Sequence, residues 1–152
     1  MKTKIQIIKS RPIFLHDWKE SKSFGVFMDF EGVFITLEEY RAKVTPYKNI
    51  EAWNEHKREA KNALALHKEE KILFATYTYE NYSGSAWVLF TKGGKLYEVN
   101  GGHCSCNGLE GQWEPEEVSL KELKNRVLNG SFGNDEYNGG DFKNELKKFL
   151  GL

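Results

Sequence analysis

The sequence predicts an α+β protein, and three patterns along the chain lead to this expectation. Apolar, β-branched and aromatic segments between residues 72 and 100 are typical of an antiparallel meander. An amphipathic stripe over residues 45–71 predicts one long central helix. Two helix-start signals follow residue 118 and predict two C-terminal helices. We therefore expect an antiparallel sheet of about five to seven strands, with the two C-terminal helices packed on one face.

Length and composition favour a single domain over residues 1–152. The chain is 39% hydrophobic and 29% charged, which is the balance of an ordinary globular domain. No apolar run approaches the roughly 20 residues that cross a bilayer, and the first residues lack the apolar core of a signal peptide. We therefore expect a cytoplasmic protein without a membrane segment.

The first third of the chain reads as sheet. Residues 4–8 and 12–15 have the composition of short strands. Residues 24–30 and 32–36 read as a hairpin whose turn includes Glu31 and Gly32.

The middle of the chain reads as a helix followed by three strands. Thr45 is a plausible cap for the helix and Pro46 fits its first turn. The apolar stripe consists of Ile50, Trp53, Ala60, Leu64 and His67. The three strands are expected at residues 72–79, 86–91 and 95–100, with turns at residues 81–84 and at Gly93 and Gly94. The aromatic residues around the first turn, which are Tyr77, Tyr79, Tyr82 and Trp87, suit packing better than binding.

The last part of the chain carries clear helix boundaries. Ser119 and Glu122 form a capping box that begins a helix over residues 120–128, and Gly130 ends it. Asp141 can cap a second helix. Its apolar face consists of Phe142, Leu146, Phe149 and Leu150. Residues 129–140 are rich in Gly, Asn and Ser and read as a surface loop.

Residues 101–115 contain the chemistry that stands out, because three reactive or metal-binding side chains follow one another closely. His103, Cys104 and Cys106 are ligand types that zinc prefers, although zinc sites more often separate paired cysteines by two to four residues. A second interpretation is a thiol nucleophile activated by a histidine, and His16, His56 or His67 would supply the base. A third interpretation is packing, in which the cysteines behave as small apolar side chains. Without a complete ligand set the sequence requires no cofactor, and zinc is the metal to test.

Charge is balanced overall and uneven locally. The chain has 22 basic and 22 acidic side chains, so no global field attracts nucleic acid. Residues 96–120 nevertheless contain no Lys or Arg, and they contain five glutamates: Glu98, Glu110, Glu114, Glu116 and Glu117. The lysines of residues 48–71 alternate with glutamates, as on a solvated helix face, which disfavours direct nucleic-acid binding.

Part of the chain resembles a family of small proteins encoded by bacteriophages and prophages. The resemblance runs from Tyr82 to Leu123, and its most specific elements are HCSC at residues 103–106, GLE at 108–110 and QWEPE at 112–116. It implies a phage accessory protein. Such proteins commonly bind and block host machinery, including restriction and CRISPR effectors, without catalysing a reaction.

The resulting expectation is a non-enzymatic protein-binding module in the cytoplasm of an infected bacterium. Its partner would be a host protein, with a nucleic-acid-binding defence effector as the leading example, because an acidic loop complements a basic groove. The expected contact residues are Glu110, Trp113, Glu114, Glu116 and Glu117. The alternative is a small zinc-binding or thiol-dependent protein that uses His103, Cys104 and Cys106.

Overall fold

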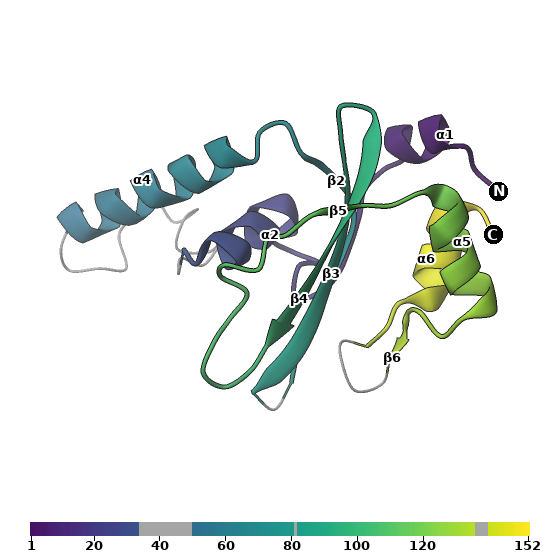
Figure 1. The fold of residues 1–152 in the computed structure, drawn as a ribbon. Coiled ribbons are helices and arrows are strands. Elements are labelled where there is room, and N and C mark those ends of the chain that lie inside the picture. The colour runs from purple at the N-terminus through teal and green to yellow at the C-terminus, as the bar shows by residue number, and fades with distance from the viewer. Residues whose placement is uncertain (34–49, 81, 136–139) are drawn as a thin grey trace.

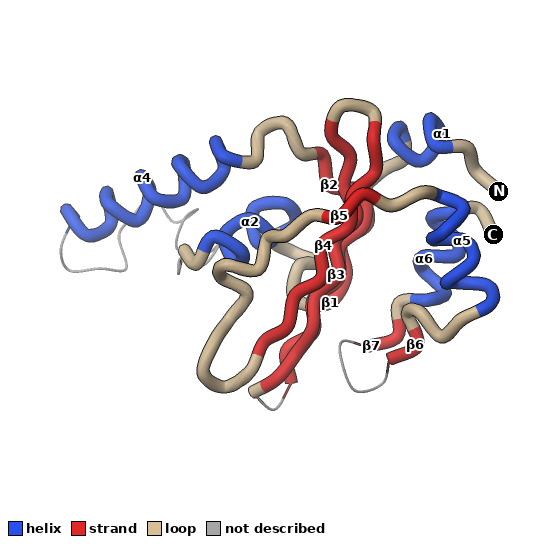
Figure 2. Tube along the Cα trace, viewed as in Figure 1, coloured by secondary structure: helices blue, strands red, loops and turns tan. Residues whose placement is uncertain are grey.

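A computed structural model describes residues 1–33, 50–80, 82–135 and 140–152, and it has an α+β fold (Figure 1). The central sheet has five strands in the order β1-β2-β3-β4-β5, and β6 and β7 form a separate pair (Figure 2). The strands are β1 (Ile13–His16), β2 (Lys71–Glu80), β3 (Ser83–Lys92), β4 (Lys95–His103), β5 (Glu116–Glu117), β6 (Asn134–Asp135) and β7 (Gly140–Asp141). The helices are α1 (Lys4–Lys9), α2 (Lys22–Glu31), α4 (Ile50–Leu66), α5 (Leu120–Asn129) and α6 (Lys143–Leu150).

Helices cover both faces of the sheet, so its central strands are buried on two sides. On β3, Val88 and Phe90 join the core formed with α2 and α4, whereas Trp87 and Leu89 join the core formed with α1, α5 and α6 (Figure 1). Successive side chains of a strand point to opposite faces, so each face receives every second residue. This two-sided burial explains the nearly continuous apolar runs of β2 and β3.

The expectation of a purely antiparallel sheet is wrong, because β1 pairs with β2 in parallel. The register places Ile13 opposite Phe74 and His16 opposite Tyr77. The chain between these strands passes through α2 and α4, and a helical crossover of this kind is the usual connection between parallel strands. The three-stranded meander of β2, β3 and β4 is antiparallel as predicted.

The predicted strand at residues 4–8 is wrong, since these residues form α1. Thr3 and Gln6 make a reciprocal capping box: the Thr3 hydroxyl accepts from the Gln6 N–H at 3.2 Å, and Gln6 Oε1 accepts from the Thr3 N–H at 2.8 Å. The capping box satisfies two backbone donors at the start of the helix. Ile7 is fully buried and attaches α1 to the sheet.

The predicted hairpin over residues 24–36 is also wrong over its first half, which forms α2. Gly32 has φ +69° and caps the C-terminal end of this helix, with its N–H directed at the carbonyls of Met28 and Asp29. A glycine in the left-handed region serves a helix end as readily as a hairpin turn, which is why the Glu31-Gly32 signal was ambiguous. Residues 34–36 of the predicted hairpin lie outside the described residues.

The long helix forms as α4, but it is not central. It extends away from the sheet on the side of α2 (Figure 1), and Ala60 and Ala63 are buried among its described side chains. The predicted helix start at Thr45 and Pro46 lies outside the described residues. Within the described ranges, no helix is both long and apolar enough to span a membrane.

The turn and C-terminal predictions are confirmed in their main features. Gly93 and Gly94 have φ +59° and +76° and form the two-residue turn between β3 and β4. The Ser119 hydroxyl accepts from the Glu122 N–H at 3.1 Å, which caps α5. Asp141 accepts from the Lys143 N–H at 3.2 Å, but the N-cap of α6 is Phe142, so the predicted cap lies one residue too early. The segment between the two helices contains the β6–β7 pair in place of the continuous loop that we expected.

Candidate functional site

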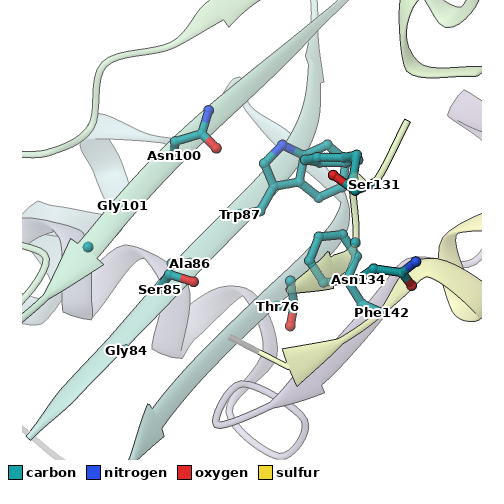
Figure 3. Close-up of a pocket in the computed structure, with 13 residues that line it drawn as sticks. Thr76, Gly84, Ser85, Ala86, Trp87, Asn100, Gly101, Ser131, Asn134 and Phe142 are labelled. Carbon is teal, nitrogen blue, oxygen red and sulfur yellow. The ribbon is translucent and has the colours of Figure 1, made fainter. Parts of the chain in front are cut away.

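A groove of about 670 Å³ lies between the sheet and the segment that leads into β6 (Figure 3). Thr76, Ser85 and Asn100 line it from three neighbouring strands, and Ser131 and Asn134 line the opposite side. Every lining residue that the structure describes is uncharged. The Thr76 side chain is 2% exposed, and its hydroxyl has no hydrogen-bond partner within the described part of the chain.

Three aromatic rings form one wall of the groove. The Trp87 ring lies 5.0 Å from that of Phe132 and 5.7 Å from that of Phe142, nearly parallel to the latter. Edge-to-face and stacked rings at these distances fix one another's orientation. The wall therefore offers a preformed apolar surface next to hydroxyl and amide groups.

A buried ion pair holds this wall against α5. Trp87 Nε1 donates to Glu98 Oε2 at 2.8 Å, and Arg126 donates to both Glu98 oxygens at 2.7 and 3.1 Å. The Arg126 guanidinium also lies over the Phe132 ring, 4.5 Å from its centroid. Glu98 is 6% exposed, so its charge is compensated in place and is not available to a partner.

The loop that follows β4 is attached to the edge of that strand by one side chain. Gln112 Oε1 accepts from the Gly102 N–H, and Gln112 Nε2 donates to the Gly102 carbonyl, both at 2.7 Å. The same nitrogen donates to the Gly108 carbonyl at 2.8 Å. A side-chain amide thus makes the two bonds that a neighbouring strand would make.

The predicted acidic contact residues are on the surface of this loop and of β5. Glu110, Glu114, Glu116 and Glu117 are all exposed. Glu110 Oε1 accepts from the Gly108 N–H at 3.2 Å, and Glu117 lies 3.8 Å from the Lys95 ammonium. We call these four residues the acidic loop face.

Trp113, the fifth predicted contact residue, packs mainly inward. Its ring stacks on Phe90 at 5.3 Å and meets Phe27, Phe30 and His67 edge to face at 5.0–5.7 Å. It is half-buried. Trp113 therefore fastens the loop to the core and supports the acidic loop face from below.

The structure does not bring His103, Cys104 and Cys106 together as a ligand set. Both cysteines are exposed free thiols, whereas both His103 ring nitrogens are buried and without a hydrogen-bond partner. Among the described residues, no group of three His, Cys, Asp or Glu side chains is placed to hold a metal ion. The zinc hypothesis stays a prediction, which a zinc measurement on protein purified without chelator tests.

Cys104 has the more reactive thiol environment of the pair. Hydrogen bonds from the backbone N–H groups of Cys106 and Asn107 lower the pKa of the Cys104 thiol. A backbone bond from Cys104 N–H to the Asn107 carbonyl at 3.1 Å closes the turn that presents them. Within the described residues no histidine ring hydrogen bonds to Cys104, so the dyad we considered is not assembled.

A second, smaller cavity of about 140 Å³ lies on the face of the sheet opposite the groove. Asp29, Tyr77, His103 and Glu110 contribute its polar groups. Only His103 and Glu110 belong to the segment that the sequence pointed to. Asp29 was missed because residues 24–30 were read as a strand, and Tyr77 because aromatic residues of the meander were assigned to packing.

His67 is the other residue whose environment the sequence did not reveal. It is 5% exposed, stacks on Phe27 at 4.5 Å, and places one ring nitrogen against Glu31 and the other 3.2 Å from Glu70. These contacts join α2, the end of α4 and, through Trp113, the loop. His67 is therefore occupied as a structural connector.

Comparison with known proteins adds no relative: no family model, no curated protein and no solved structure matches the chain.

Proposed function

We propose that the protein is a non-enzymatic binding module that attaches to a host protein through the acidic loop face. The observation that carries this proposal is a surface of four exposed carboxylates on a segment whose backbone is fixed by Gln112 and Trp113. A preorganised surface loses little conformational entropy on binding, which favours affinity without a catalytic site.

The negative charge of the acidic loop face favours a partner with a basic surface. No Lys or Arg occurs in residues 96–120. Among the described salt bridges, one involves the acidic loop face, and it joins Glu117 to Lys95. Complementary charge accelerates encounter and disfavours wrong partners. A host effector that binds nucleic acid in a basic groove fits this chemistry, and blocking that groove would make the protein an inhibitor of a host defence system. The phage resemblance supports the same setting.

Charge reversal tests the proposed interface. The tagged protein is purified from a bacterial lysate, and native mass spectrometry identifies any bound partner. The affinity for that partner is then measured. We expect the triple variant Glu114→Lys, Glu116→Lys, Glu117→Lys to bind at least about tenfold more weakly, with the loss decreasing as salt is raised.

The matched control reverses three exposed glutamates in α4 and α6: Glu55→Lys, Glu59→Lys and Glu145→Lys. It changes the net charge by the same amount at a distant surface, so we expect less than about a twofold effect. An equal loss of affinity in the two variants would mean that net charge alone weakens binding. An unchanged affinity in the acidic-loop variant would show that the acidic loop face is not the interface.

A second candidate function rests on the groove, whose lining combines aromatic rings with hydroxyl and amide groups. This combination suits an uncharged ring with hydrogen-bonding groups on its edge, because stacking and neutral hydrogen bonds are available and no charge is compensated. The unpartnered Thr76 hydroxyl would gain a partner.

Ligand-observed NMR with nucleosides and with monosaccharides tests the groove. We expect one class to bind, and Asn100→Asp to weaken it about tenfold by placing a charge beside an uncharged ligand. Asn125→Asp makes the same change on α5, outside the groove, and is expected to leave binding unaltered. If neither class binds at millimolar concentration, the groove is not a site for such rings.

A further inference from the structure

The small cavity on the α2 side of the sheet is lined by acidic side chains, whereas the groove is lined by uncharged residues. It is enclosed by the end of α2, by β2 and β4, and by the first part of the loop after β4. Asp29, Tyr77, His103 and Glu110 come from these four segments. Gly32 and Gly108 also line the cavity, and because they have no side chain they do not fill it.

The hydrogen-bond donors next to this cavity are already used. Trp18 Nε1 donates to Asp29 Oδ2 at 2.7 Å, and the Gly108 N–H donates to Glu110 Oε1 at 3.2 Å. One oxygen of each carboxylate is left without a partner in the described structure. The groups that remain free are therefore chiefly acceptors.

The imidazole of His103 in the lining also lacks a partner. Both of its ring nitrogens are buried and make no hydrogen bond to any described residue. Tyr77, which also lines the cavity, is 7% exposed. Buried polar groups are rarely left unsatisfied, so the unpaired histidine in this small cavity indicates that something else binds there.

Among the described residues, no Lys or Arg forms a salt bridge with the acidic groups at this cavity. Asp17, Asp29 and Glu110 make none within the described part of the chain, and His16 lies beside Asp17 and His103 beside Asp29. Burial, together with the charges of these three carboxylates, raises the pKa of Tyr77. Burial also raises the pKa of Asp29. A cation in the cavity would relieve both effects.

We propose that this cavity binds a cationic N–H donor, a guanidinium or primary ammonium group, between Asp29, Glu110, His103 and Tyr77. Such a group carries positive charge and several donors and no acceptor, which complements a lining of free acceptors. The Tyr79 ring, 4.5 Å from that of His103, adds an aromatic face next to the site. No three of the described side chains are placed to hold a metal ion, which favours an organic cation.

The cation can come from a free amine or guanidine, or from an Arg or Lys side chain of a bound protein. The second source rests on the proposed function, because Glu110 belongs to both the cavity and the acidic loop face. The test therefore uses small probes, so that its failure does not depend on any protein partner.

The full chain is titrated with N-acetyl-arginine amide while the amide NMR signals of His103 and Gly108 are followed. N-acetyl-citrulline amide is the matched probe, since it has nearly the same shape and no charge. We expect saturable shifts with the arginine probe and at least about tenfold weaker binding of the citrulline probe. Equal binding of the two probes, or no shift with either, would overturn the proposal. N-butylguanidine, which has the same single charge and neither amide group, distinguishes the sources: tighter binding than the arginine probe indicates a free guanidine, and weaker binding indicates a side chain.

The double variant Asp29→Asn, Glu110→Gln removes both charges and keeps an acceptor for Trp18 and Gly108. We expect it to lose at least about tenfold in affinity for the arginine probe while its amide spectrum stays folded. The control Glu114→Gln, Glu116→Gln removes the same charge from the acidic loop face outside the cavity and is expected to change affinity less than about twofold. An equal loss in the control would show that the general negative field, and not the cavity, attracts the probe.

Discussion

Gln112 has a structural role that its position in the sequence does not reveal. The QWEPE element drew attention to this segment, whose expected contribution was carboxylates and a tryptophan on the surface. The amide of Gln112 replaces a neighbouring strand at Gly102, and Trp113 packs against the core. β5 pairs only with Tyr97 and Glu98, so the later backbone groups of β4 need another partner. Which groups these are depends on the sheet topology, and the sequence does not show it.

Asp29 carries a prediction about pH at the same scale. Its folded pKa is raised, so between its ordinary pKa of 3.8 and the raised value the folded protein binds more protons than the unfolded chain. The free energy of unfolding contributed by this group therefore decreases as pH rises through that window. Because Asn cannot ionise, we expect Asp29→Asn to be more stable than the parent at pH 7, with the difference disappearing towards pH 3.

Urea unfolding of both proteins across this pH range measures the effect. Glu116→Gln, an exposed change outside the cavity, serves as the control and should show no such pH-dependent gain. A parent protein that is more stable than Asp29→Asn at pH 7 would contradict the raised pKa of this carboxyl.

At the scale of elements, periodicity identified the meander and the C-terminal helices and failed for the first two helices. The strands β2, β3 and β4 and the cap at Ser119 are encoded locally, by alternation, paired glycines and a capping side chain. In contrast, α2 is short and apolar on most sides because it is covered by α4 and the sheet. A short apolar run of this kind carries no period that separates a helix from a strand.

The β2–β3 hairpin provides a prediction for a whole element. A Cβ atom on Gly84 would lie 1.7 Å from the backbone carbonyl oxygen of Thr78, so the hairpin cannot accept a side chain there without moving its backbone. We expect Gly84→Ala to lower the free energy of unfolding by about 2–3 kcal/mol, the range of overpacked sites. Thermal and urea unfolding measure it.

Gly102 is the matched control on the neighbouring strand, where it pairs with Ser85. A Cβ atom there meets nothing within 4 Å, so Gly102→Ala should change the free energy of unfolding by less than about 1 kcal/mol. Similar values for the two variants would contradict the close approach of Gly84 to Thr78.

At the scale of the whole molecule, the sheet separates two different surfaces. The uncharged groove lies on the face shared with α5 and α6, and the acidic cavity lies on the face shared with α2. The sequence predicted the α+β class, and its proposal that the segment after β4 is functional stays a prediction. It could not predict the two-sided arrangement or the cavity, because both require α2 to lie against β2 and β4. That contact joins residues far apart in the chain and leaves no pattern of spacing.

The parallel pairing of β1 has a consequence for the order in which the protein folds. The meander and its hairpin turns need only neighbouring residues, so β2, β3 and β4 can associate early, whereas β1 reaches β2 only after the crossover through α2 and α4 has closed. Contacts of such long sequence separation form slowly, because the entropy of closing the loop is lost before the contact is gained. We therefore expect the edge at β1 to be completed last and to open first. Because α2 belongs to that crossover, the acidic cavity should assemble in the same late step.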